Sequence, residues 1–282
     1  MEPIVLIHGY SAESVKTDKP SIVNIYGTLP QSLQDLYGQN SVVEIDLSRY
    51  VSLEDGVTVD DISHGLQRAL QTDFPHLLKG PFHVIIHSTG ALVIRNWIRR
   101  FSKIPSPIKN LIHLAGANFG SGWAHIGKGQ MARWGRFIFE HGAERGLQVL
   151  DALELGSDWT LDLHRHFLRE GTKMLEDYKI FEYAVIGTQA DPAWYTFPIR
   201  YGKEDGSDGV VRVSGGNLNF NYIRFGPTAD AMNISWEEAK KEIPKHIKGT
   251  GEKQYYEIKE ISQPGAGNRL PIPFAIPYQC AH

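Results

Sequence analysis

Ser88 stands at an abrupt change in the sequence, inside the stretch HVIIHSTGAL that runs from His83 to Leu92. An apolar run ends at Ser88 and a second one begins almost at once, which predicts a buried strand that turns directly into a helix. A serine at the tip of such a turn exposes its hydroxyl, and nearby backbone N–H groups point to the same place. Gly90 supplies a small residue after the serine, although Ile86 stands where a second glycine is usual. Ser88 is therefore a candidate nucleophile, and a serine that caps the following helix is the alternative.

Strand-like and helical runs alternate around Ser88. Apolar runs predict strands over 3–9, 40–48, 82–88, 108–116 and 178–189. Runs with helical spacing predict helices over 27–38, 58–73 and 90–102, and Thr58 opens the second of these with acidic residues in its first turn. This order predicts an α/β fold in which a mostly parallel central sheet carries helices on both faces. Nearer the end of the chain, alternation over 253–262 and 269–282 predicts an antiparallel pair of strands.

Ligands of such sheets bind beyond the carboxyl ends of the strands. His8-Gly9, Ser88 and Ala115-Gly116 each follow one of the predicted parallel strands. We therefore expect three separate segments to converge on one crevice at this edge of the sheet.

The bulk properties of the chain exclude several classes of protein. The chain has 282 residues, 41% of them hydrophobic, and a formal net charge of -3, so it can bury a substantial core. Lysine and arginine are scattered, which argues against a nucleic-acid partner. Cys280 is the single cysteine, which excludes an internal disulfide and a multi-cysteine metal site. No apolar stretch reaches the length of a membrane span, so no integral membrane segment is expected. The N-terminal residues predict a strand and lack the pattern of a signal peptide, so we expect a soluble, cytoplasmic protein, with the mature form of a secreted protein as the alternative.

Four stretches, in the order VLIHGY, IHSTGALVIRNWI, LIHLAGANFGSG and GSDGVV, resemble the α/β-hydrolase fold and, within it, the bacterial lipase and esterase families. The resemblance covers most of the chain and is loose over the stretch 118–170 and over the last sixty or so residues. It implies that Ser88 is the nucleophile of a serine hydrolase. In those families one oxyanion donor follows the His-Gly strand end and the other follows the nucleophile, which here are the backbone N–H groups of Tyr10 and Thr89.

The resemblance also implies that the catalytic acid follows the serine in the chain and that the histidine comes last. Two aspartates compete for the role of the acid. Asp208 lies in SDGVV, which is similar to the NDGLV segment of many lipases, and Gly209 with the two following valines supplies a turn and a buried anchor. Asp191 directly follows a predicted strand, which is also a common place for the acid. We favour Asp208 and keep Asp191 as the alternative.

Two histidines follow Asp208. His282 comes directly after the last predicted strand, where this fold presents its base, but it is the final residue of the sequence. His246 lies in a polar stretch rich in lysine. We favour His282 as the base and keep His246 as the alternative. His164 and His166 are two residues apart on a predicted helix, so they do not share a face as metal ligands.

The pattern of parallel strands and helices is interrupted between residues 118 and 170. This stretch carries many aromatic residues and no clear strand, so we predict a helical cap or lid over 118–170 and a hydrolase core over 1–117 and 171–282. Such a cap could supply an apolar site for the acyl group of a water-insoluble ester. A pair of helices that completes the core is the alternative.

These observations predict a serine carboxylic-ester hydrolase, of the lipase or esterase kind, that works through Ser88, Asp208 and His282. Its substrate would be a small-molecule ester or a lipid, reached through transient contact with a lipid interface. A phospholipase or lysophospholipase, a thioesterase and an acyltransferase would use the same triad and remain alternatives, as does a non-catalytic binding scaffold. No acidic cluster has the spacing of a metal site, so we expect no metal and no cofactor. The sequence gives no expectation for the oligomeric state.

Overall fold

The structure is a computed structural model. It describes residues 2–7, 25–51, 56–122, 124, 147–189, 206–220, 222–235, 237–238, 240–241, 256–262 and 272–276. The chain divides into two compact units, Met1–Asn219 with Gly265–His282 and Phe220–Pro264. Each unit is described by itself below.

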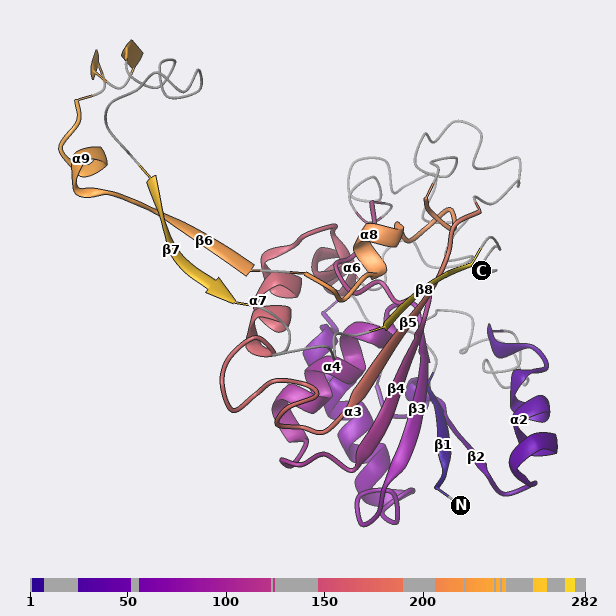
Figure 1. Ribbon diagram of the computed structural model, residues 1–282. Helices are drawn as coiled ribbons and strands as arrows, with labels where there is room; N and C mark the ends of the chain where they lie inside the picture. The colour runs from indigo at the N-terminus through magenta and orange to yellow at the C-terminus, as the bar shows by residue number, and fades with distance from the viewer. Residues whose placement is uncertain are drawn as a thin grey trace. The chain divides into compact units, whose positions relative to one another are not determined.

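A six-stranded sheet with the order β2-β1-β3-β4-β5-β8 forms the centre of the first unit (Figure 1). The strands are β1 (Ile4–Ile7), β2 (Val42–Ile45), β3 (Phe82–His87), β4 (Ile108–Leu114), β5 (Phe181–Gly187) and β8 (Ile272–Ile276). Every neighbouring pair in this sheet is parallel. The predicted α/β class with a mostly parallel sheet is therefore confirmed.

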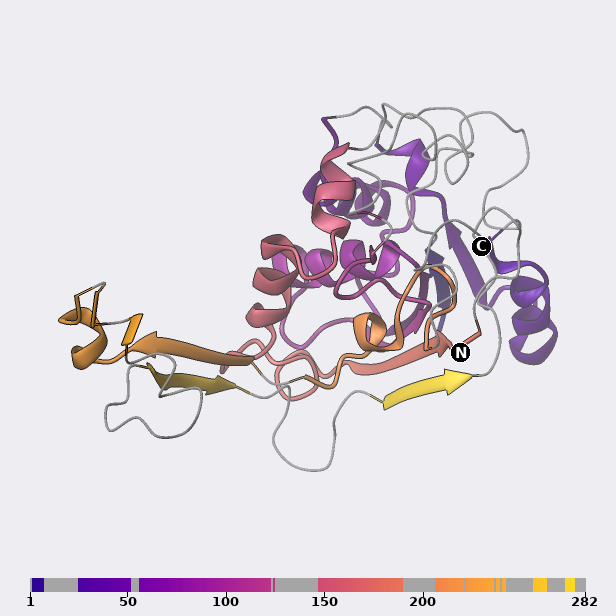
Figure 2. The same cartoon turned by 90° about the horizontal axis from the view of Figure 1, so that it is seen from above.

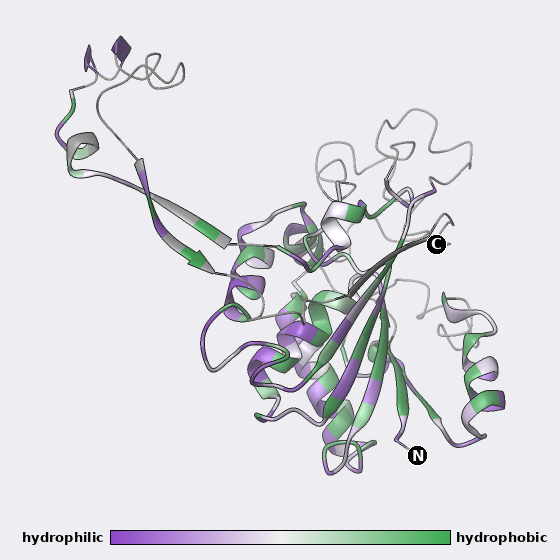
Figure 3. Ribbon diagram, in the orientation of Figure 1, coloured by the Kyte–Doolittle hydropathy of each residue, from purple (hydrophilic) through white to green (hydrophobic). Residues whose placement is uncertain are grey.

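The helices of the first unit cover the two faces of this sheet (Figures 1 and 2). They are α2 (Leu29–Tyr37), the short 3-10 helix η2 (Leu47–Arg49), α3 (Val59–Thr72), α4 (Gly90–Phe101), α6 (Leu147–Leu153), α7 (Asp158–His166) and α8 (Val213–Gly216). Side chains of a strand point alternately to the two faces. Accordingly Val84 and Ile86 belong to the larger core cluster with α3, α4 and α7, whereas Ile85 belongs to a smaller cluster with Leu29 and Leu33 of α2. In Figure 3, α2 and α3 carry both colours, as helices with one buried face do.

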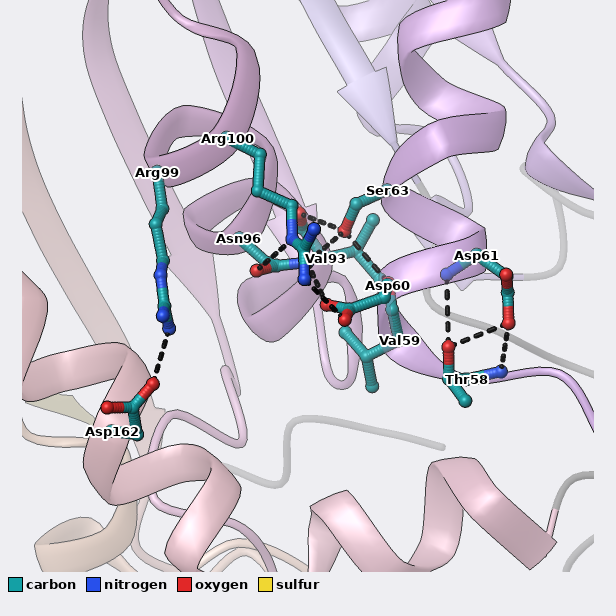
Figure 4. A network of polar contacts seen from close by, with 10 residues as sticks. All are labelled: Thr58, Val59, Asp60, Asp61, Ser63, Val93, Asn96, Arg99, Arg100 and Asp162. Carbon is teal, nitrogen blue, oxygen red and sulfur yellow. Dashed lines mark hydrogen bonds and ion pairs between the residues drawn. The ribbon is translucent and has the colours of Figure 1, made fainter.

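A network of polar contacts joins α3 to α4, the helix that follows Ser88 (Figure 4). The Ser63 hydroxyl oxygen is fully buried and lies 2.8 Å from the Val59 carbonyl oxygen and 3.1 Å from that of Val93. Asn96 donates its side-chain N–H to Ser63 Oγ at 3.0 Å and to Asp60 Oδ1 at 2.8 Å. Buried polar atoms that find partners cost little stability and permit one arrangement of the two helices. The network therefore fixes α4 against α3.

Residues 147–170, which form the larger described part of the expected cap, contribute to the larger core. Val149 of α6, Leu163 of α7 and Phe167 beyond it are buried in the same cluster as α3 and α4. Residues 125–146 lie outside the described residues. The proposed boundaries of the cap, 118–170, stay a prediction.

The second unit contains an antiparallel pair of strands, β6 (Tyr222–Pro227) and β7 (Tyr256–Ser262), and a short helix, α9 (Ala229–Met232). The prediction that 253–262 pairs with 269–282 was wrong, because β7 pairs with β6 and β8 lies parallel to β5. Alternation identifies a strand but does not select its partner, which depends on contacts across the whole sheet. Phe220–Pro264 forms a compact unit of its own within the stretch 171–282 that we assign to the hydrolase core. The extent of the hydrolase core, 1–117 and 171–282, stays a prediction.

Candidate active site

Ser88 lies in the turn between β3, which ends at His87, and α4, which begins at Gly90. Its φ is 52°, in the left-handed region that residues with a Cβ rarely adopt. Two backbone hydrogen bonds hold this turn on the neighbouring strand end: Ser88 donates to the Leu114 oxygen and Ala117 donates to the Ser88 oxygen, both at 3.2 Å. A strained residue that its surroundings hold in place is characteristic of a functional site, and a nucleophile on a strand-to-helix turn is one such case.

The N-cap position of α4 belongs to Thr89, and no side-chain hydrogen bond caps this helix. Ser88 therefore does not serve as the capping serine. The backbone N–H of Thr89 has no hydrogen-bond acceptor among the described residues, and Thr89 is 7% exposed. An N–H group at the first turn of a twelve-residue helix carries a partial positive charge that suits an anionic oxygen.

The strand β1 ends beside the turn of Ser88, because Ile7 pairs with Ile86 in the parallel register. The hydroxyl of Tyr26 lies 2.6 Å from the Ile7 carbonyl oxygen and 3.2 Å from that of Ile85. Burial raises the pKa of this hydroxyl above its usual value, so it stays protonated and can donate. Tyr26 therefore anchors the end of β1, from which the His8-Gly9-Tyr10 segment continues.

Asp208 lies in a tight turn before α8 and is 2% exposed. Its Oδ1 accepts backbone hydrogen bonds from Val210 at 2.9 Å and Val211 at 2.7 Å. Gly209 adopts a φ of 97°, which glycine tolerates, and Val211 is fully buried. The turn and the buried anchor predicted from the sequence SDGVV are both present.

The other predicted site residues, Tyr10, Asp191, His246 and His282, lie outside the described residues. Of the predicted site residues, the structure therefore describes Ser88, Thr89 and Asp208. β8 is parallel to β5 and ends at Ile276, so the end of β8 lies at the same edge of the sheet as Ser88. His246 belongs to the range of the second unit.

A buried ionic cluster next to the site was not predicted from the sequence. Arg95 of α4 forms an ion pair with Glu182 of β5, and His113 Nε2 of β4 lies 3.3 Å from Glu182 Oε1. Burial would raise the pKa of Glu182, but Arg95 and His113 outweigh it and lower that pKa to about 2. Burial lowers the pKa of His113, which keeps this ring neutral. One signal for this cluster was present: Glu182 alternates with Ala184 and Ile186 along the buried side of β5.

His164 of α7 lies next to this cluster and is 1% exposed. Its Nε2 contacts the backbone oxygen of Asn118. Burial, together with the nearby charge of Arg95, lowers the pKa of His164 to about 3. The neutral ring can therefore donate to Asn118 and stabilise the segment that follows β4.

Searches of known sequences and solved structures gave different results. No protein-family model and no curated protein sequence matches this chain. Two structures of the phospholipase PlaB from Legionella pneumophila, one of them in complex with thio-NAD, match with TM-scores of 0.71 and 0.69 at 28% and 26% identity. Both matches cover 97% of this chain but 52% and 50% of the PlaB chains, so this chain spans about half the length of PlaB. The mature lipase BlEst2 from Bacillus licheniformis matches with a TM-score of 0.50 at 14% identity, over 77% of this chain and 79% of the lipase. The chain therefore has the α/β-hydrolase fold and is related to that superfamily.

The described residues also give two negative findings. Among them, no helix is long and apolar enough to cross a membrane. The same part of the chain contains no group of three or more histidine, cysteine, aspartate or glutamate side chains that could hold a metal ion.

Proposed function

We propose that this chain is a serine ester hydrolase that cleaves acyl esters of lipids. One observation carries this proposal: Ser88 is held at a φ of 52° between β3 and α4, directly before Thr89, the N-cap residue of α4. This arrangement presents a hydroxyl and an oxyanion donor to the same carbonyl group. The fold shared with the lipase BlEst2 is consistent with it.

In the proposed mechanism, Ser88 Oγ attacks the ester carbonyl carbon while a histidine accepts its proton. The N–H groups of Thr89 and Tyr10 stabilise the negative oxygen of the tetrahedral intermediate. The histidine then protonates the alcohol, which leaves, and a water molecule hydrolyses the acyl-enzyme by the same steps. Asp208 orients the imidazole and stabilises its charged form. The two amide bonds to Oδ1 fix the plane of the carboxylate, so we assign Oδ2 to this task.

We propose His282 as the base, with His246 as the alternative. The parallel direction of β8 supports His282, because the chain beyond Ile276 continues from the carboxyl edge of the sheet. If this assignment holds, His282→Ala abolishes hydrolysis and His246→Ala leaves it within about twofold. The reverse result would transfer the role to His246.

The substrate class that we favour is the acyl ester of a phospholipid. This choice rests on the match to the phospholipase PlaB, which extends over 97% of this chain. Because the chain spans about half of PlaB, the substrate class needs a direct test. This test measures the release of fatty acid from phosphatidylcholine vesicles, from lysophosphatidylcholine, from a triacylglycerol emulsion and from a p-nitrophenyl ester series that runs from acetyl to palmitoyl. Hydrolysis of the p-nitrophenyl esters without either phospholipid would reassign the substrate to a simpler ester. Product analysis with added alcohols and thioesters separates hydrolysis from acyl transfer and thioester cleavage.

The serine itself is tested by Ser88→Ala, for which we expect a loss of kcat of at least about 10³-fold, as for other serine hydrolases. The matched control is Ser102→Ala, since Ser102 is a half-buried serine at the other end of the same helix. Its activity should stay within about twofold of the unmodified protein. Hydrolysis that survives Ser88→Ala would remove Ser88 from the mechanism. No hydrolysis of any ester by the unmodified chain would favour the binding scaffold.

A further inference from the structure

Residues Gly116–Ser121, which we name the bridge segment, follow β4 and contact both the turn of Ser88 and the turn of Asp208. At its first end, Ala117 N–H donates to the backbone oxygen of Ser88 at 3.2 Å. Gly116 fits closely here, because a Cβ at this position would lie 3.1 Å from Ala91 Cβ of α4. The bridge segment is therefore bonded directly to the nucleophile's own peptide group.

At its other end, the bridge segment bonds to the turn that carries Asp208. Ser121 Oγ donates to the Val210 carbonyl oxygen at 2.5 Å, and the N–H of Val210 in turn donates to Asp208 Oδ1 at 2.9 Å. Asn118 donates its side-chain N–H to the Gly216 oxygen of α8 at 2.9 Å. Two side chains thus hold Val210, within this turn, and Gly216, at the end of the short helix that follows it.

The bridge segment has little freedom to move. Asn118 is fully buried and Ser121 is 7% exposed. Gly120 has a φ of +86°, and a Cβ there would lie 2.5 Å from the backbone oxygens of Leu153 and Glu154. Ser121 N–H also donates to the Leu153 oxygen at 2.8 Å. Because a tightly packed segment of this kind has no free space around it, a shift at one end also moves the other end.

We propose that Ser121 and Asn118 are positioning residues that set the place of Asp208 relative to Ser88. This inference rests on the proposed function, because it assigns Asp208 the role of the catalytic acid. Neither side chain would touch the substrate. Their hydrogen bonds connect the two turns through one short, buried segment, so the loss of one bond lets the Asp208 turn shift while the nucleophile stays in place.

Ser121→Ala tests this inference, because it removes one hydroxyl and little volume. We expect kcat for a p-nitrophenyl ester to fall about 10- to 100-fold, as catalysis does when a group is displaced by about an ångström, with KM changed less than about threefold. The acid limb of the kcat/KM profile should move to lower pH, since a carboxylate that shifts away no longer raises the pKa of the base imidazole. Ser121→Thr keeps the hydroxyl and should recover most of kcat. A Ser121→Cys variant keeps the volume with a weak donor and should show the same changes to a smaller extent if Ser121→Ala does not fold.

Ser63→Ala is the matched control, because Ser63 is also buried and its hydroxyl contacts backbone carbonyls, but between α3 and α4. It should lower Tm by an amount similar to Ser121→Ala and leave kcat and the pH profile unchanged. If Ser121→Ala behaves like Ser63→Ala, with a lower Tm and an unchanged kcat and acid limb, the inference is overturned. If hydrolysis by the unmodified protein does not depend on Ser88, the proposed function itself fails, and this inference fails with it.

Discussion

At the scale of single residues, the backbone of Ser88 shows a conflict between stability and chemistry. A φ of 52° costs a residue with a Cβ about 1–3 kcal/mol, whereas glycine adopts this region freely. The two hydrogen bonds to the end of β4 hold the turn in this conformation. The site thus keeps a side chain that its backbone conformation disfavours, which is expected where that side chain is needed for function.

This conflict gives the first stability prediction. Ser88→Gly should raise the free energy of unfolding by about 1 kcal/mol relative to Ser88→Ala, measured by urea unfolding, while both variants lose hydrolysis. Gly27 already has a positive φ of 54°, so Gly27→Ala is the matched control and should destabilise the protein. A Ser88→Gly variant that is less stable than Ser88→Ala would mean that the turn relaxes when the hydroxyl is removed.

At the scale of elements, a buried ion pair joins helix α4, which follows Ser88, to strand β5. Arg95 and Glu182 are 2% and 6% exposed, and the guanidinium of Arg95 also lies 4.5 Å from the ring centroid of Phe167. A buried ion pair contributes little net stability over an apolar pair, but one buried charge left alone is costly. The pair therefore specifies which face of α4 meets the sheet more than it stabilises the fold.

Glu182→Gln should accordingly destabilise the protein by about 3–5 kcal/mol, because it leaves the Arg95 guanidinium buried without a counter-charge. The double variant Arg95→Met, Glu182→Gln should recover much of this loss. Urea unfolding of both single variants and the double variant gives the coupling energy as a double-mutant cycle. Additive effects, with a coupling energy near zero, would contradict the account of a coupled pair.

At the scale of the whole molecule, the sequence predicted the elements better than it predicted their partners. The helix α3 was predicted from its own capping signal, and the structure shows the capping box between Thr58 and Asp61. The position of Val42–Ile45 as a strand likewise follows from local pattern. The partner of β8 and the packing of α6 and α7 on α3 and α4 depend on contacts between distant segments, which no local pattern encodes.

The residues of the candidate site likewise fall into two groups, those that the sequence could indicate and those that depend on contacts between distant segments. Ser88 and Asp208 could be proposed because the stretches around them resemble segments of α/β-hydrolases, and because Gly90 and Gly209 supply the small residues that a tight turn needs. Asn118 could not be proposed, because its contact with Gly216 joins residues far apart in the sequence. Its importance follows from the folded arrangement alone.

The last prediction concerns the stability of the whole molecule toward acid. His164 is buried and neutral, with its pKa lowered to about 3 by burial, whereas a histidine in the unfolded chain has a pKa of about 6.5. A folded-state pKa below the unfolded value means that the unfolded state binds the proton. The stabilisation is therefore complete above about pH 6.5 and is lost as the pH falls toward 3, with a slope of up to about 1.4 kcal/mol per pH unit for each such histidine.

His164→Gln removes this titration and keeps an N–H that can reach the Asn118 oxygen. Urea unfolding is measured between pH 4.5 and 8, a range that spans the unfolded-state pKa of about 6.5. The free energy of unfolding of His164→Gln should fall less steeply in acid, with a slope smaller by up to about 1.4 kcal/mol per pH unit, which corresponds to one proton. The exposed His76 provides the matched control, because His76→Gln makes the same substitution at a side chain outside the core. If the two variants and the unmodified protein share one slope, the acid sensitivity comes from other groups, of which the buried His113, with its lowered pKa, is the next to test. Above about pH 6.5, His164 is neutral in both the folded and the unfolded state, so its titration no longer changes the stability of the protein. Activity assays of the Ser88 and Ser121 variants above this pH therefore compare proteins free of this effect.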